Sequence, residues 1–218
     1  MFRSVVIALR SSVMPIDLRQ LVAPEHTAVL TMEMQRGVMG DLAAMPSIAQ
    51  AVAAQGIVEP TARLLAAARA AGVRVVHCTA EFREDRAGSA ANSPMLALAS
   101  RNPTIIAGTP GVDIIPELDQ QPGDLVSTRF HGLSPFMGTA LDITLHNLGV
   151  RTVVATGFSI NIGIFGMLLG AVDLGYSAVL ATDCVGGIPE DYAQAVIDNS
   201  LALLATRTTA DDLIALWS

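Results

Sequence analysis

Cysteine and aromatic residues are scarce in this chain of 218 residues. It holds two cysteines, Cys78 and Cys184, and only 4% of its residues are aromatic. Two cysteines cannot form the disulfide framework that many small secreted domains depend on, and each is expected to be a small buried apolar residue. The core must therefore consist mainly of Ala, Val, Leu and Ile.

Positive charge is also in short supply. The chain carries 13 Lys and Arg against 20 Asp and Glu, a net charge of -7, and no run of five or more basic residues. Nucleic-acid binding requires clustered Lys and Arg, so we expect no such partner. No uncharged apolar stretch approaches the roughly 20 residues of a membrane span. The N-terminal run VVIAL is shorter than the roughly 7–15 residues of a signal-peptide core, so we expect a soluble cytoplasmic protein.

What the chain does contain is a regular alternation of two patterns. Apolar runs typical of strands cover 27–33, 73–80, 124–130, 151–157 and 176–183, and helical patterns cover 57–72, 139–149, 161–175, 189–206 and 209–217. Strand and helix follow each other with short connections, which is typical of parallel strands joined by helical crossovers. We predict an α/β fold of three layers, in which a mostly parallel, Rossmann-like sheet has helices on both faces.

One domain is expected, because the chain is 51% hydrophobic and shows no internal repeat. Residues 25–218 form this domain, and residues 1–24 are interpreted as an N-terminal extension that packs on a partner. The stretch 81–123 is rich in Pro, Gly, Ser and Asn, and is predicted to be a long loop over the sheet edge.

Open α/β sheets bind ligands at the carboxyl ends of their strands. The residues expected to meet there are Glu33 after the first strand, 77–81 after the second, Arg129 and His131 after the third, and 158–163 after the fourth. The site would then combine one acid, one cation and the start of a helix.

Several segments in order resemble the isochorismatase-like hydrolases, also called the cysteine hydrolase superfamily. They include AVLTMEMQRGVMGD, GVRVVHCTAEFRED, the run from GTPG through PEL and PGD to SPFMGT and LD, and DLGYSAVLATDCVGG. The similarity covers about residues 25 to 208. It implies an isochorismatase-like hydrolase domain, a small-molecule substrate, and a homodimer or homotetramer.

The resemblance also defines which catalytic residues are replaced. Members that cleave amides are similar in carrying an Asp after the first strand, a Lys before the S-x-F motif and a Cys at the helix start. Here these positions hold Glu33, Arg129 (or Phe130, one place later) and Gly163. A covalent acyl-enzyme requires a thiolate or an activated hydroxyl, so the amidase mechanism of the family does not transfer.

Isochorismatases proper hydrolyse a vinyl ether without the Cys. The resemblance therefore implies a hydrolase in which Glu33 acts as acid or base on a vinyl ether or a C–N bond, and Arg129 holds an anion. Phe158, Ser159, Asn161 and Gly163 would bind substrate through the helix start. The alternative is a catalytically inactive member that acts as a ligand-binding or assembly protein.

The remaining polar candidates have weaker signals. His131 is either a general base or a surface residue, whereas His77 is expected to be a core histidine. Gln35 is expected to support the loop after the first strand and to contribute to substrate binding. No His pair has the spacing of metal ligands, so neither a metal nor another cofactor is expected. Four aromatic residues, Phe82, Phe130, Phe136 and Phe158, are either pocket walls or ordinary core.

Overall fold

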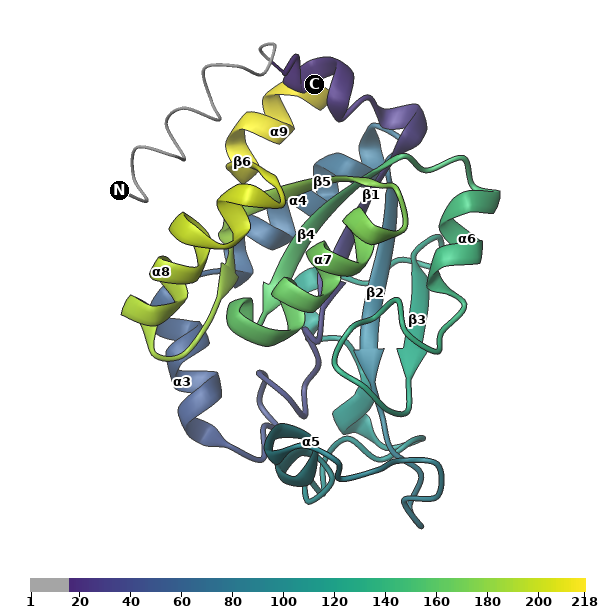
Figure 1. The fold of residues 1–218 in the computed structure, drawn as a ribbon, viewed down its shortest axis with the longest axis vertical. Helices are drawn as coiled ribbons and strands as arrows, with labels where there is room; N and C mark the ends of the chain where they lie inside the picture. The colour runs from purple at the N-terminus through teal and green to yellow at the C-terminus, as the bar shows by residue number, and fades with distance from the viewer. Residues whose placement is uncertain (1–15) are drawn as a thin grey trace.

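The computed structural model describes residues 16–218, which contain one six-stranded parallel sheet (Figure 1). The strands are β1 (Thr27–Met32), β2 (Arg74–Ala80), β3 (Leu125–Arg129), β4 (Thr152–Phe158), β5 (Ser177–Gly186) and β6 (Thr206–Thr208). Their spatial order is β3-β2-β1-β4-β5-β6, and every neighbouring pair is parallel. The predicted α/β class with a parallel sheet is confirmed.

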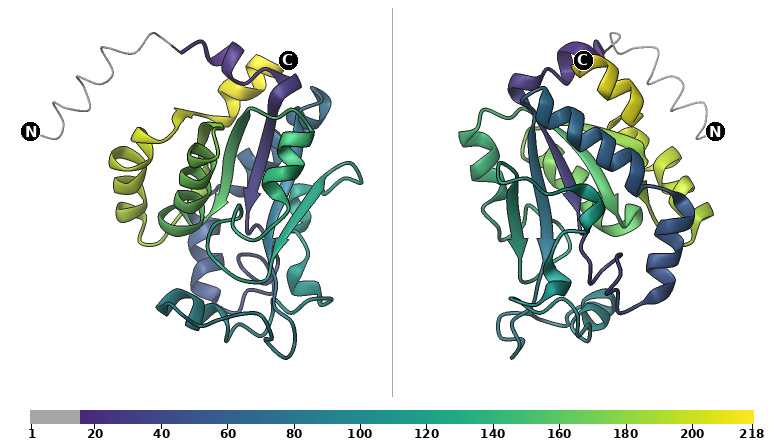
Figure 2. Two further views of the ribbon diagram at one scale, coloured as in Figure 1. Left: turned by 45° about the vertical axis from the view of Figure 1, so that its right-hand side comes forward. Right: turned by 180° about the vertical axis from the view of Figure 1, so that it is seen from behind.

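Helices cover both faces of this sheet, as Figure 2 shows. One face packs against α6 (Leu141–Asn147), α7 (Phe165–Asp173) and α8 (Glu190–Asn199), and the other against α2 (Leu18–Leu21), α3 (Pro46–Gln55), α4 (Val58–Ala70) and α9 (Ala210–Trp217). Every residue of β1 and β4 is buried. Burial on both faces explains why these strands are nearly continuous apolar runs in the sequence.

Four details differ from the sequence predictions. The helix predicted over 161–175 begins with a π-helical turn, Ile160–Ile164, before α7. The helix predicted over 189–206 ends at Asn199, and Thr206–Thr208 instead forms the edge strand β6. Three residues are too few to show a strand periodicity. The predicted loop 81–123 contains the short helix α5 (Pro94–Ala99), and α3 was not predicted.

The described part of the N-terminal extension packs on the domain itself. The indole Nε1 of Trp217 donates to the carbonyl of Val22 at 2.8 Å, and Thr152 Oγ1 donates to the carbonyl of Leu21 at 2.7 Å. Val22 is buried in the core cluster beneath α4 and α9. Residues 16–24 thus contact α9 and β4 of the same chain, the contact of the extension with a partner stays a prediction, and residues 1–15 lie outside the described part. None of the helices in 16–218 has the length and hydropathy needed to cross a membrane.

A buried polar network ties together β1, β2, the residue before β3 and α4. Thr31 and His77 are register partners on β1 and β2, with Thr31 Oγ1 2.8 Å from His77 Nδ1. His77 Nε2 lies 3.3 Å from Asp124 Oδ2, and Arg69 Nη2 donates to the same oxygen at 2.8 Å. Burial lowers the pKa of His77 below its usual 6.5, although Asp124 acts in the opposite direction. His77 is thus a core histidine with both ring nitrogens in hydrogen-bond contact, as predicted.

This network predicts how stability depends on pH. The unfolded chain protonates His77 near pH 6.5 while the folded chain resists protonation, so the unfolded state binds more protons as the pH falls. We expect the free energy of unfolding to decrease between pH 7 and 5 by up to about 1.4 kcal/mol per pH unit from this residue. Urea unfolding at several pH values should show a shallower decrease for His77→Gln. Equal slopes for both proteins would contradict the role assigned to His77.

Candidate functional site

The strand order places the candidate site where the chain reverses direction across the sheet. From β1 the chain continues to β2 and β3 on one side, and later to β4, β5 and β6 on the other. Ligands of open α/β sheets bind at such switch points, next to the carboxyl ends of the strands. Glu33 follows β1 there, and Ser159 follows β4.

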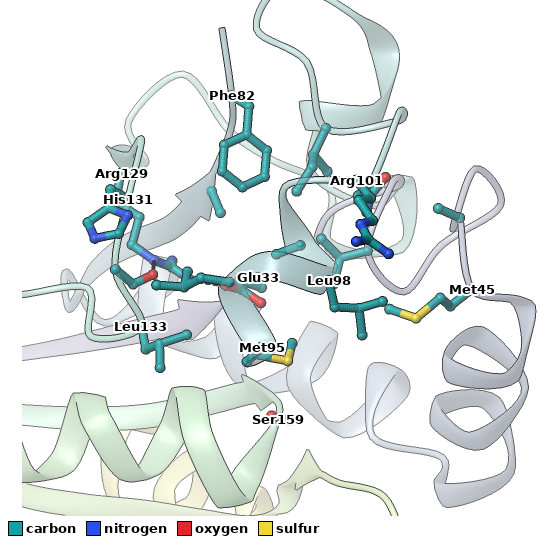
Figure 3. Close-up of a pocket in the computed structure, with 18 of the residues that line it drawn as sticks. Glu33, Met45, Phe82, Met95, Leu98, Arg101, Arg129, His131, Leu133 and Ser159 are labelled. Atoms are coloured by element: carbon teal, nitrogen blue, oxygen red, sulfur yellow. Dashed lines mark hydrogen bonds and ion pairs between the residues drawn. The ribbon is translucent and has the colours of Figure 1, made fainter. Parts of the chain in front are cut away.

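Glu33 has an unusual backbone conformation. Its φ is 52°, in the left-handed region that non-glycine residues seldom adopt. Two hydrogen bonds fix it: the Glu33 amide donates to Cys78 O at 2.9 Å, and the Gln35 amide donates to Glu33 O at 2.8 Å. Such conformations cost roughly 1–3 kcal/mol and concentrate at functional sites. The conformation turns the chain out of β1 and aims the Glu33 side chain into a cavity (Figure 3).

Arg129 is the cation that pairs with Glu33. It lies at the end of β3, is 5% exposed, and its Nη2 donates to Glu33 Oε1. Nε donates to Gly132 O at 3.0 Å and Nη1 to Thr79 O at 3.4 Å. Burial lowers the pKa of Arg129 to about 10, which leaves it charged at neutral pH. Phe130, the other residue considered at this position, is 49% exposed and has no charge.

The pair lies at one side of a cavity of about 250 Å³. Its walls are mostly apolar and come from the loop after β1, from α3, from α5 and its flanks, and from the ends of β2, β3 and β4. They include Val38, Ile48, Phe82, Met95, Leu98, Ile105 and Phe158. Apolar walls with a few polar groups at one end are typical of small-molecule sites.

Of the other predicted site residues, three line this cavity and three do not. His131, Phe158 and Ser159 contribute to the lining, with the His131 ring on the Arg129 side in Figure 3. His131 Nδ1 accepts a hydrogen bond from the Ala90 amide at 3.4 Å, which ties it to the 81–93 loop. Gln35, Asn161 and Gly163 lie outside the lining.

Gln35 does not line the cavity because its side chain is buried in hydrogen bonds with two other segments of the chain. It is fully buried, and Nε2 donates to Ala80 O and Val112 O at 3.0 Å each. Its Oε1 accepts from the Ala80 amide at 2.8 Å. The side chain therefore joins the ends of β1 and β2, which confirms the expected support of this loop and corrects its placement among the substrate-binding residues.

The described chain offers no accessible thiol to this site. Gly163 lies within the π-helical turn, and a Cβ added there would lie 3.0 Å from Met32 Cε and 3.3 Å from Phe158 O. Cys78 and Cys184 are 1% and 0% exposed, and burial raises the pKa of both thiols. Both are small core residues, as the sequence suggested.

The aromatic candidates divide between the core and the cavity wall. Phe136 stacks on Tyr176 with ring centroids 5.8 Å apart and belongs to the core, while Phe82, Phe130 and Phe158 line the cavity.

Arg101 also lines the cavity, and it was not predicted from the sequence because it follows α5 in a stretch without periodicity. Within 16–218, no three His, Cys, Asp or Glu side chains are grouped so as to hold a metal ion.

Comparison with known proteins agrees with this fold and shows the family. The family profile described as Isochorismatase domain matches residues 27–212. Ureidoacrylate amidohydrolase RutB of Rhizobium rhizogenes is 29% identical over 98% of this chain and 90% of its own length. The protein of the same name from Agrobacterium fabrum is 30% identical over 78% of this chain and 80% of its own length.

Solved structures show the same architecture. An isochorismatase family protein from Desulfovibrio vulgaris superposes with a TM-score of 0.74 at 28% identity, covering 88% of this chain and 99% of its own. A cysteine hydrolase from Pseudomonas syringae superposes with a TM-score of 0.75 at 23% identity, over 90% and 94% of the two chains. The second likeness supports the fold alone.

The Glu33–Arg129 pair predicts a measurable energetic coupling. Breaking a fully buried pair costs about 3–5 kcal/mol. Because the Glu33 side chain is 21% exposed, we expect about 1–3 kcal/mol for either single change. Urea unfolding of Glu33→Gln, Arg129→Met and the double variant gives the coupling energy, which should be about 1 kcal/mol or more.

An exposed pair serves as the matched control for this cycle. Arg83 and Asp85 form an ion pair in which the side chains are 61% and 58% exposed. Their coupling, from Arg83→Met and Asp85→Asn, should be well below 1 kcal/mol. A coupling between Glu33 and Arg129 no larger than this control would contradict the prediction, because the pair would then stabilise the fold no more than an exposed pair does.

Proposed function

Because the chain belongs to the isochorismatase family and is a hydrolase, we propose that it cleaves a C–N bond of a small molecule. In this proposal, water attacks the substrate directly, Glu33 is the general base, and no covalent intermediate forms. The observation that carries it is the charged Glu33–Arg129 pair at one side of an apolar cavity without an accessible thiol.

The pairing with Arg129 favours a base over an acid. Arg129 is bonded to Glu33, and a nearby cation stabilises the charged form of a carboxyl group, which is the form that acts as a base. Only Oε1 is bonded to Arg129, and Oε2 has no hydrogen-bond partner within residues 16–218. That oxygen is available to accept a proton from a water in the cavity.

The proton and the oxygen can be followed through the reaction. Water attacks the carbonyl carbon of the scissile amide or ureido group while Glu33 Oε2 takes one of its protons. Arg129 has N–H groups beyond those given to Gly132, Thr79 and Glu33, and one of these stabilises the tetrahedral oxyanion. Glu33 then returns the proton to the leaving nitrogen as the C–N bond breaks.

Vinyl-ether hydrolysis, the other reaction considered from the sequence, requires a different charge state. There, a protonated carboxylic acid must deliver its proton to carbon. The pairing with Arg129 does not suit this role, because a nearby cation stabilises the charged form of a carboxyl group rather than the acid. The curated relatives are named for amide hydrolysis, which also supports the C–N bond.

We also propose that the protein assembles with copies of itself. On the α6–α7 face, Ile143 is 59% exposed, and Leu169 and Val172 are 40% exposed each. Large apolar side chains exposed on the helices of one sheet face are candidates for an interface. Analytical ultracentrifugation of the full chain should show a dimer or tetramer at micromolar concentration. A monomer throughout that range would contradict the assembly.

Replacement of Glu33 tests the catalytic proposal. The panel contains ureidoacrylate, N-carbamoyl-β-alanine, simple primary amides and a vinyl ether. We expect turnover of a ureido or amide compound, and Glu33→Gln should lower its kcat by about 100- to 10,000-fold, since a general base contributes an effect of this size. Assays are run well below the Tm of both proteins.

Glu84→Gln is the matched control, because Glu84 is exposed and lies outside the lining of the site cavity. It should leave kcat unchanged. Retained turnover of the ureido or amide compound by Glu33→Gln would contradict base catalysis by Glu33. Turnover of the vinyl ether alone would contradict the C–N assignment.

A further inference from the structure

A second cation, Arg101, lines the same cavity and has no role in the proposed reaction. In Figure 3 its side chain extends toward the cavity on the side away from Arg129 and His131. We propose that Arg101 binds an anionic group of the substrate, most simply a carboxylate, and thereby selects for substrates that carry one. This inference rests on the proposed function and adds the substrate class to it.

Arg101 is an exposed residue on the cavity lining, and it differs from most other arginines in that its guanidinium has no partner in the described part of the protein. Within residues 16–218, four arginines make neither an ion pair nor a side-chain hydrogen bond: Arg19, Arg74, Arg101 and Arg151. Of these four, Arg101 alone lines the site cavity. Its donors are free to bind a ligand, and a planar guanidinium matches a carboxylate with two parallel hydrogen bonds.

The backbone that carries Arg101 is held in place. The Arg101 amide donates to Leu98 O at 3.1 Å, and the next residue, Asn102, is bonded through its side chain to Thr104 and Gly37. Arg86 Nη2 donates to Asn102 O at 2.8 Å. The Arg101 backbone therefore has a fixed place on the cavity wall, while its side chain has no partner in the described part of the protein.

The charges of the cavity favour an anion. Glu33 and Arg129 neutralise each other, and the other ionisable side chains in the lining are Arg101 and His131. Without counting His131, the lining thus carries a surplus positive charge of one, although the whole chain has a net charge of -7. An anionic substrate is attracted to such a cavity against the overall charge of the molecule.

The apolar lining between the two ends defines the rest of the substrate. Phe82, Met95, Leu98 and Ile105 contribute side chains to the walls of the cavity that holds Arg101 and Glu33. A matching molecule has a carboxylate at one end, a short apolar or unsaturated segment, and the scissile amide or ureido group at the other. A cavity of about 250 Å³ limits it to a small compound.

Turnover of a matched pair of substrates tests this selection. The pair is the best ureido or amide substrate with its carboxylate, and the same compound with a neutral carboxamide in place of that carboxylate. Arg101→Met should lower kcat/KM for the carboxylate about 10- to 100-fold, mainly through KM, since a charge-assisted hydrogen bond is lost. The neutral compound should change less than threefold.

Arg83→Met is the control, since Arg83 pairs with Asp85 outside the site cavity and should leave both substrates unchanged. Loss of kcat/KM by the same factor for both substrates would overturn the inference, because a general effect on folding would explain it. An unchanged kcat/KM for the carboxylate would overturn it as well.

Binding without turnover separates this inference from the proposed reaction. Hexanoate and hexanol are titrated by calorimetry into the wild type, Arg101→Met and Glu33→Gln. Hexanoate should bind the wild type and Glu33→Gln about 10-fold or more tightly than Arg101→Met, and hexanol should bind all three alike. This pattern would support the anion site even if no C–N bond were cleaved. Equal affinity of hexanoate for all three would overturn it.

Discussion

The ion pair between Glu33 and Arg129 is the interaction on which the candidate site depends, and three features of the fold must coincide to form it. Because β3, β2 and β1 are parallel neighbours, the carboxyl ends of β1 and β3 lie on the same side of the sheet. The left-handed conformation of Glu33 turns its carboxylate out of β1 toward Arg129. Arg129 is positioned by two backbone carbonyls in addition to Glu33. Because the cation is almost fully buried, removing the acid would leave an uncompensated charge.

In the proposed mechanism the same pair sets the role of Glu33. A cation beside a carboxylate stabilises its charged form, and only that form can accept a proton from water. The thiols that could form an acyl-enzyme are buried in the core, and the helix start after β4 has a glycine packed against Met32. In the proposed mechanism water attacks the substrate directly, and an apolar cavity strengthens the electrostatic interactions that guide this attack.

Much of this arrangement could be predicted from the sequence. Strands buried on both faces, such as β1 and β4, produce continuous apolar runs in the sequence. Parallel topology then places the residues that follow the strands at their carboxyl ends, and these residues are Glu33, Arg129, His131, Phe158 and Ser159. The short edge strand β6 was missed because three residues carry no period. Gln35 was misplaced because its neighbours Ala80 and Val112 are distant in sequence. Arg101 was missed because it follows α5, in a stretch fixed by tertiary hydrogen bonds rather than by periodicity.

The most direct test of water attack assisted by Glu33 follows the oxygen atom through a single turnover. Enzyme in excess over substrate is mixed in water labelled with heavy oxygen, and the acid product and the Glu33 peptide are analysed by mass spectrometry. Direct attack predicts one labelled oxygen in the acid product of an amide substrate, no label in Glu33, and no peptide heavier by the acyl group at any quench time. An unlabelled acid product, or an acyl group found on Glu33 or on another side chain such as Ser159, would mean that the protein itself attacks the substrate and would contradict direct attack by water.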